Sequence, residues 1–351
     1  MSTTEKDFNT LFKRKTLIKG VVWLSLITIS GLAFVFFYHH TSSFVSSVVQ
    51  IRPGYILLCL LMIAIDLLLG GWRNHIFIRK LYPGLSAMVS FKANTANMFM
   101  GAVTPFHSGA GPGQLYVYHR HGVKLLDGFI VSLINMGATL IFMPLAGLTA
   151  LLAMDHTGLE GGMITTLLKY GFGVFGLFLL VFLLAFIRPV WLSDVIEKIC
   201  SFFGVLFPSK RRSLRGWAVQ SGRSILKYQQ ICRRLLKQNP LLFPFSLLMT
   251  CLLYFNKYAM QYVILLGLGV HTSLAEVISI QVLIQFMIYF APSPGGSGFA
   301  EAGIGLLFSR IVPTSVLPMF TLLQRSFLLF IPAVIGAWVV LRLLERQARQ
   351  N

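Results

Sequence analysis

Six apolar stretches, each about as long as a bilayer is thick, restrict what this chain can fold into. A helix needs about 20 predominantly apolar residues to cross the hydrocarbon core. Charged residues make up only 12% of the 351 residues, whereas soluble domains carry about 25%. Helices satisfy their own backbone hydrogen bonds in lipid, so the pattern predicts an all-α polytopic membrane protein. The stretches are 20–38, 55–72, 124–151, 165–187, 241–268 and 314–341.

Two shorter apolar stretches run directly into segments rich in Pro and Gly. The stretches are 86–103 and 277–291, and the segments are 104–114 and 291–301. Pro and Gly interrupt a helix and free backbone polar groups, which persist in a bilayer only where protein or trapped water bonds them. Superimposed without a gap, the segments match at four positions: Pro105 with Pro292, Gly109 with Gly296, Gly111 with Gly298 and Gln114 with Glu301.

We interpret each short stretch and its segment as a re-entrant helical hairpin, near 86–122 and 277–310. Neither stretch is long enough to cross the membrane alone. Paired interruptions in the two halves of a membrane protein are typical of a transporter-type binding site. The alternative is that the residues after each interruption form full spans, which would give eight spans and no hairpins.

Lys and Arg are concentrated on one side of the predicted membrane. The N-terminal segment 1–19, the loop 188–240 and the tail 342–351 are rich in them, whereas the connections on the other side hold at most one each. The positive-inside rule then places both termini in the cytoplasm. In this orientation the two hairpins enter from opposite sides, so the membrane halves 20–187 and 241–341 are predicted to be inverted repeats.

The basic loop contains two further patterns. Residues 190–207 and 214–236 combine apolar residues at near-helical spacing with charged residues, which predicts two amphipathic helices. These helices either lie on anionic lipid at the membrane surface or pack on the cytoplasmic ends of the spans. Attraction to anionic headgroups also accounts for the net charge of +19 without a nucleic-acid partner.

Charged residues within the predicted membrane region are candidates for function, because a charge at the bilayer centre costs about 3 kcal/mol or more unless it faces a cavity or a partner. Glu301 follows the second Gly cluster, and Arg325 lies in the last apolar stretch. We expect the two to pair, or Arg325 to bind a lipid phosphate through its planar guanidinium while Glu301 balances the charge. The alternative is an ion pair that only fixes the second hairpin against the last span.

Asp66 and Lys257 are a second charged pair of candidates. Asp66 lies in the middle of the stretch 55–72, and Lys257 lies within 241–268. An intramembrane Asp is a candidate for proton coupling, and it is equally a candidate for a structural partner of Lys257. Lys257 is alternatively a ligand for a phosphate.

The two Pro/Gly turns complete the predicted substrate-binding site. Gly allows successive backbone N–H groups to converge on an anion, and the helices that begin after the turns would point their positive dipole ends toward the membrane centre. Close packing of helices through small residues is the alternative. The turn residues assigned to the site are Pro105, His107, Gly109, Gly111, Gln114, Pro292, Pro294, Gly295, Gly296 and Gly298.

Two kinds of side chain near the turns have both a binding and a structural interpretation. His107 titrates near neutral pH if it meets water, or it is a simple hydrogen-bonding residue. The amides of Asn94, Asn97, Gln281 and Gln285, on the helices that enter the hairpins, either join helices or line a headgroup cavity.

The second segment, with Pro292, Pro294, Gly295, Gly296, Gly298 and Glu301 followed by Arg325, resembles the lysylphosphatidylglycerol synthase transmembrane-region family. That family includes the flippase-like membrane half of the bacterial multiple peptide resistance factor. The resemblance extends over about residues 15–345 and includes the Thr-Pro-x-x-x-Gly-x-Gly pattern at 104–111. The first segment departs from the family, since Gln114 stands where Glu is usual and no Arg lies near Asn135.

The resemblance implies a multi-pass protein of a bacterial or archaeal cytoplasmic membrane that moves lipids between leaflets or otherwise serves envelope lipid synthesis. The expected partners are membrane lipids of the anionic phospholipid or polyprenyl-phosphate type, and an envelope-synthesis enzyme. Bifunctional members also carry a soluble aminoacyl-transfer domain. About ten residues follow the last predicted span, so we do not expect aminoacyl-lipid synthesis by this chain alone.

Motifs of other chemistries are missing from the sequence. It has no Walker A loop, dinucleotide fingerprint, His-Glu-x-x-His or Gly-x-Ser-x-Gly, and its four Cys have the spacing of neither a disulfide framework nor a metal site. No cofactor or metal is therefore expected. The leading hypothesis is a lipid translocase. The alternatives are a membrane-embedded transferase with Asp66 or Glu301 as its base, and a non-catalytic partner of an envelope-synthesis enzyme that binds through the basic loop.

Overall fold

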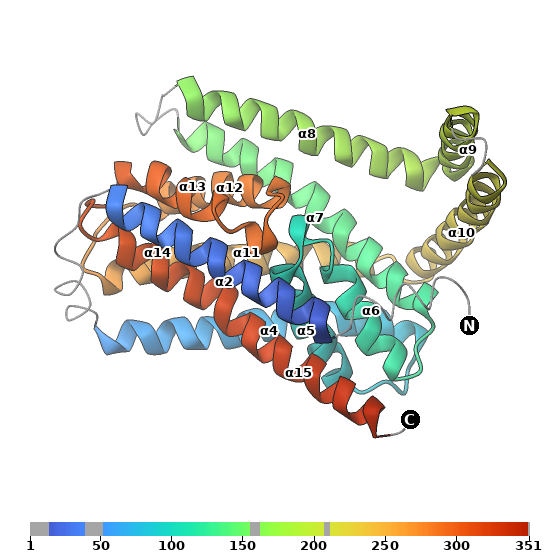
Figure 1. Ribbon diagram of the computed structural model, residues 1–351, viewed down its shortest axis with the longest axis horizontal. Helices are drawn as coiled ribbons and strands as arrows, with labels where there is room; N and C mark the ends of the chain where they lie inside the picture. The colour runs from blue at the N-terminus through green and yellow to red at the C-terminus, as the bar shows by residue number, and fades with distance from the viewer. Residues whose placement is uncertain (1–13, 39–51, 155–161, 207–210, 350–351) are drawn as a thin grey trace.

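The computed structural model describes residues 14–38, 52–154, 162–206 and 211–349, and these contain helices but no strands (Figure 1). Three helical stretches are long and apolar enough to cross a membrane, namely Pro53–Leu81, Leu125–Ala150 and Leu317–Arg346. Shorter apolar helices accompany them within the described residues. The chain is therefore an all-helical membrane protein.

Helices lie at every apolar stretch that the sequence predicts to cross the membrane or to enter a hairpin. The six longer stretches correspond to α2 (Arg14–Tyr38), α4 (Pro53–Leu81), α7 (Leu125–Met154), α8 (Gly162–Ile187), α11 (Leu242–Gly267) and the continuous α14 (Leu317–Arg325) and α15 (Ile331–Ala348). The two shorter stretches correspond to α5 (Ala87–Val103) and α12 (Leu274–Phe290). A π-helical turn, Ser326–Phe330, joins α14 to α15 directly after Arg325.

The helices α5 and α12 are each 17 residues long and are bounded by the same kinds of signal. Ser86 caps α5 by accepting the Met88 N–H, and Ser273 and Glu276 form a capping box at the start of α12. Each helix ends two residues before a Pro, and the residue between them, Thr104 or Ala291, has an extended backbone.

A short helix follows each interruption. Helix α6 (Ala110–Arg120) packs along α5, and α13 (Phe299–Leu307) packs against α12. They are 11 and 9 residues long, too short to cross a bilayer on their own. The 3-10 turns at the two interruptions, η1 (Pro105–His107) and η3 (Pro294–Gly296), contact each other.

The turns share a backbone conformation that corrects the sequence match between the two segments. After Pro105, Phe106 and His107 have φ of 53° and 57°, and after Pro294, Gly295 and Gly296 have φ of 60° and 66°. Pro105 therefore corresponds to Pro294 and not to Pro292. Three residues separate α12 from its turn, whereas Thr104 alone separates α5 from its own, and a superposition without a gap cannot represent this difference.

The helices after the turns extend this correction to the remaining matched residues. Gly109 caps α6 and Gly298 caps α13, so Gly109 corresponds to Gly298. Gln114 then does not correspond to Glu301, because it lies further along its helix.

Polar contacts join α4 to α11 in an antiparallel pair. The Arg52 N–H donates to the Gly267 carbonyl at 3.4 Å, and the Asn256 amide donates to the Met62 carbonyl at 2.9 Å. Near the other end, the Arg73 guanidinium donates to the Thr250 hydroxyl at 3.0 Å. The Pro53 end of α4 thus lies beside the Gly267 end of α11.

The basic loop forms two helices, α9 (Pro189–Leu206) and α10 (Arg211–Gln238), which pack against each other. They lie toward the same end of the bundle as the Arg14 end of α2 and the Ala348 end of α15 (Figure 1). The Tyr228 ring packs on Phe129 of α7, with 4.9 Å between ring centroids, so α10 covers the end of a span. Both helices also expose large apolar side chains, among them Trp191, Phe202 and Trp217.

Glycines bring the first and last long helices close to the hairpins. Gly20 of α2 leaves no room for a Cβ beside Val103, and Gly336 of α15 leaves none beside the Thr95 carbonyl and Phe99 of α5. A Cβ on Gly31 of α2 would fit only tightly beside the Glu301 side chain. Close backbone approach through small residues is the usual way membrane helices associate.

Replacing Gly336 with Ala is expected to lower the stability of the protein by about 1–3 kcal/mol, because the methyl group would force α15 away from α5. Gly176→Ala in α8 is the matched control, since its Cβ meets open space. There the higher helix propensity of Ala is expected to raise stability by about 0.5–1 kcal/mol. Thermal unfolding of the purified proteins in detergent measures both effects, and shifts of the same sign would contradict the packing.

Candidate functional site

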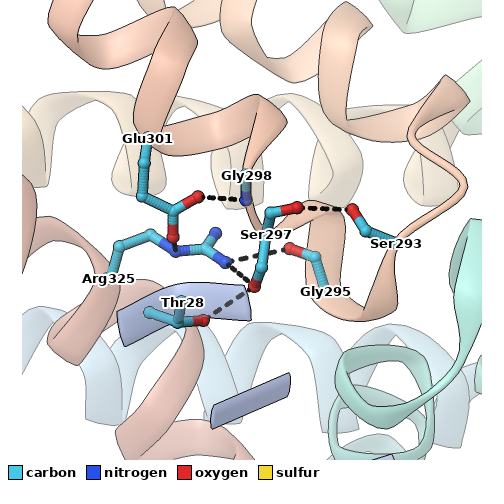
Figure 2. Close-up of polar contacts among 7 residues, drawn as sticks. All are labelled: Thr28, Ser293, Gly295, Ser297, Gly298, Glu301 and Arg325. Carbon is cyan, nitrogen blue, oxygen red and sulfur yellow. Dashed lines mark hydrogen bonds and ion pairs between the residues drawn. The ribbon is translucent and has the colours of Figure 1, made fainter. Parts of the chain in front are cut away.

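A buried ion pair connects the last long helix to the second hairpin (Figure 2). Arg325 Nε lies 2.8 Å from Glu301 Oε1, and both side chains are almost completely buried. Arg325 Nη2 also donates to the Gly295 carbonyl at 3.2 Å and to the Ser297 hydroxyl at 2.7 Å. The guanidinium therefore fixes α14 to the turn as well as to the start of α13.

Glu301 has a second role at the start of α13. Its Oε2 accepts the backbone N–H of Gly298 at 2.6 Å, which caps the helix. A carboxylate at this position also interacts favourably with the positive end of the helix dipole. Gly298 has φ of 86°, a conformation that a residue with a side chain rarely adopts. Glu301 and Arg325 are thus paired in the structure. Pairing was the first of the two arrangements expected for them.

The turn amides are engaged within the turn itself. The N–H groups of Gly296 and Ser297 donate to the carbonyls of Ser293 and Pro294, each at 3.1 Å, and the Gly298 N–H is held by Glu301. Thr28 of α2 shares a hydrogen bond of 2.8 Å with the Ser297 hydroxyl. The sequence interpretation required these three amides to be free to bind an anion. In this conformation they are not free.

A polar cavity of about 120 Å³ lies where the two hairpins, α11 and α14 meet. It brings together four of the predicted site residues from separate parts of the chain: His107, Lys257, Gly295 and Arg325. His107 and Gly295 come from the two turns in contact, η1 and η3. The amides of Gln281, Gln285 and Gln324 and the ring of Tyr258 complete the polar part of the lining.

Each cation of the cavity is paired with a carboxylate that lies outside the cavity lining. Lys257 Nζ is 3.7 Å from Asp66 Oδ2, and the Lys257 side chain is 30% exposed while that of Asp66 is 6% exposed. Arg325 likewise forms its ion pair with Glu301, which does not line the cavity. The cavity therefore presents the positive ends of two ion pairs, which favours an anionic ligand.

Two lining residues, Gln324 and Tyr258, were missed in the sequence interpretation. The Gln324 amide donates to Gln281 at 3.0 Å, while its oxygen and the Tyr258 hydroxyl have no hydrogen-bond partner among the described residues. Tyr258 directly follows the intramembrane cation Lys257 in the sequence, and Gln324 directly precedes Arg325. That adjacency is the signal that was available.

Arg73 is a second omission. It lies one residue beyond the predicted apolar stretch 55–72, but α4 continues to Leu81 and carries Arg73 into the bundle. There it contacts Thr250, and its Nε is buried without a hydrogen-bond partner in the described part of the chain. The apolar residues Ile76, Phe77 and Ile78 that follow it were the signal for a longer helix.

The predicted turn residues other than His107 and Gly295, together with Gln114, do not line the cavity. The Gln114 oxygen accepts from the Asn97 amide at 3.3 Å and so joins α6 to α5. The Gly109 N–H donates to the Thr104 hydroxyl at 2.8 Å, and a Cβ on Gly111 would meet open space. Pro105 and Pro292 are exposed, while Pro294 and Gly296 are buried within the second segment. These residues shape the turns and are not part of the cavity lining.

A double-mutant cycle tests the ion pair. Glu301→Gln and Arg325→Gln each leave one buried charge without its partner, which is expected to cost about 3–5 kcal/mol. The double variant removes both charges and is expected to be more stable than the sum of the single effects predicts. Thermal unfolding in detergent measures the coupling, and additive effects would show that the two groups do not interact.

Comparison with known proteins assigns the chain to a family. Residues 22–336 match the family model described as the lysylphosphatidylglycerol synthase TM region. The chain is also 25% identical over 311 residues to a UPF0104 membrane protein of Archaeoglobus fulgidus, covering 86% of this chain and 90% of that protein. The matched region contains both turns and the Glu301–Arg325 pair. The protein belongs to the lysylphosphatidylglycerol synthase transmembrane-region family.

Proposed function

We propose that this protein is a lipid translocase, which moves a lipid with an anionic or phosphate-bearing headgroup between the leaflets of a bacterial or archaeal cytoplasmic membrane. The observation that carries the proposal is the polar cavity, with Lys257 and Arg325 facing it and their carboxylates behind them. A headgroup that enters the bilayer loses its hydration and needs compensating charge and hydrogen bonds. The cavity supplies both.

The contacts between helices support six spans with two re-entrant hairpins in inverted orientation. Helices α4 and α11 are antiparallel, because Arg52 bonds to Gly267. The first hairpin follows the Leu81 end of α4, and the second follows the Gly267 end of α11, which lies beside Pro53. The hairpins are thus attached to opposite ends of this helix pair, and their turns contact each other. This arrangement is the one expected of inverted repeats around a central site.

The proposed mechanism uses the side chains that line the cavity. Arg325, through Nη1, and the Lys257 ammonium hold the headgroup phosphate, while the amides of Gln281 and Gln285 bond its remaining polar groups. Rocking of the two halves about the contact between the turns would open the cavity to one leaflet and then to the other. With both termini and the helices α9 and α10 in the cytoplasm, these basic helices lie where anionic headgroups attract them.

The transferase alternative requires a general base close to the substrate. Asp66 and Glu301, the carboxylates considered for that role, are buried in ion pairs and lie outside the cavity lining. The geometry therefore favours binding and movement of a headgroup over its chemical modification.

Reconstitution in vesicles tests the proposal. Purified protein is incorporated into vesicles that contain a headgroup-labelled anionic phospholipid in one leaflet, and its appearance in the other leaflet is followed by quenching. Movement of a lipid that is unchanged by mass spectrometry supports a translocase. A modified lipid points instead to the transferase, and the absence of movement for both anionic phospholipids and polyprenyl phosphates overturns the proposal.

The double variant Asp66→Asn/Lys257→Gln is expected to slow the movement of an anionic lipid at least tenfold, a change of about 1.4 kcal/mol, since it removes a cavity cation without leaving a buried charge alone. Lys257→Arg, which keeps the charge, is the matched control and is expected to retain most of the rate. The transport assay measures both variants at equal amounts of folded protein. An unchanged rate in the double variant would exclude Lys257 from headgroup binding.

A further inference from the structure

An apolar groove of about 530 Å³ lies beside the polar cavity, between α7, α11 and α12. Its walls are apolar side chains from the three helices, including Phe142 and Ala146, Leu247 and Phe255, and Ile278 and Val282. Its volume falls within the range of about 300–1,000 Å³ that is usual for ligand sites. The groove is thus large enough for an extended hydrocarbon chain.

Tyr258 belongs to the linings of both the groove and the polar cavity. Its side chain is buried, with 2% of its surface exposed, and its hydroxyl has no hydrogen-bond partner among the described residues. Buried hydroxyls are normally paired, so an unpaired one marks a position where a polar partner is missing. Tyr258 thus lies between a cationic cavity and an apolar groove.

We propose that the groove binds the hydrocarbon chain of the same lipid whose headgroup occupies the cavity, with the Tyr258 hydroxyl donating to the headgroup where the two parts join. The inference rests on the proposed function and adds to it the part of the substrate that lies outside the cavity. A cationic cavity and an apolar groove that share Tyr258 as a lining residue match the two parts of an amphiphile. The substrate is therefore recognised as a lipid phosphate, and inorganic phosphate alone fills only half of the site.

Its position next to the cavity, with Tyr258 in both linings, distinguishes this groove from an ordinary lipid-facing surface. Helix α12 forms one wall of the groove, and it also carries Gln281 and Gln285 of the cavity. Helix α11 likewise provides Lys257 to the cavity and Phe255 to the groove. A chain held between these helices stays attached to the headgroup site throughout movement of the lipid.

Photo-crosslinking locates the chain without requiring transport. The full-length protein in vesicles is exposed to trace phosphatidic acid that carries a diazirine in the middle of one acyl chain, and labelled peptides are identified by mass spectrometry. Labelling concentrated in residues 142–150, 247–258 and 275–282 is expected. Labelling spread evenly over lipid-facing helices such as α2 and α8 would overturn the proposal. If the groove is labelled but no lipid moves, the translocase function fails and the groove remains a lipid site.

Filling the groove gives a second test with a matched control. Ala146→Phe places a ring inside the groove, whereas Leu148→Phe places the same ring at an exposed position outside it. Crosslinking of the groove peptides is expected to fall at least tenfold in the first variant and to be unchanged in the second. Equal labelling in both variants would contradict the assignment. Leu145→Trp, on the exposed rim of the groove, replaces Ala146→Phe if that variant does not fold.

Chain length provides a measure of specificity. Unlabelled long-chain phosphatidic acid is expected to compete with the probe at least tenfold better than a water-soluble short-chain phosphatidic acid, and Ala146→Phe is expected to remove that difference. Inorganic phosphate is expected to compete no better than the short-chain lipid. If the long-chain and short-chain lipids compete equally for the unsubstituted protein, the headgroup alone determines binding.

Discussion

The structure depends on the buried ion pair between Arg325 and Glu301. Arg325 connects to Glu301, to the Gly295 carbonyl and to the Ser297 hydroxyl, so one guanidinium holds the last long helix, the second turn and the start of α13 together. A buried cation without these partners would cost several kcal/mol. The same pairing leaves the cation at the cavity and the carboxylate behind it, so the contact that stabilises the hairpin also gives the cavity its positive character.

The two turns explain how chain segments so far apart share one cavity. Each begins with a Pro and continues with two residues of positive φ, which reverses the chain within a few residues. In the second turn both residues are Gly, and the conformation carries little strain. In the first they are Phe106 and His107, where it is costly, since few residues other than Gly adopt it. Strained residues tend to lie at functional sites, and His107 faces the cavity.

Much of the fold follows from the sequence because hydropathy and helix-breaking residues act locally. The starts and ends of α5 and α12 lie within a few residues of their predicted positions, since Ser86 and Ser273 cap them and Pro105 and Pro292 end them. The pairings of Glu301 with Arg325 and of Asp66 with Lys257 also follow, because isolated charges in a membrane need partners. The helical nature of the basic loop was predictable for the same local reasons.

Other features depend on contacts between distant segments and were not predictable. The three residues Ala291–Ser293 before the second turn shift its match to the first, which an ungapped comparison cannot detect. The turn amides bond within the turn, and only the three-dimensional arrangement shows that Gln324 and Tyr258 line the cavity while Gln114 does not. Arg73 is a different case, because the apolar residues Ile76, Phe77 and Ile78 after it were a local signal that α4 continues. The measurement that tests the account most directly is an experimental structure of the protein in a bilayer disc containing phosphatidic acid. We predict a phosphate within hydrogen-bonding distance of Lys257 and Arg325, with its chain passing Tyr258. A cavity that holds water alone, with lipid confined to the outer surface of the helices, would contradict the account.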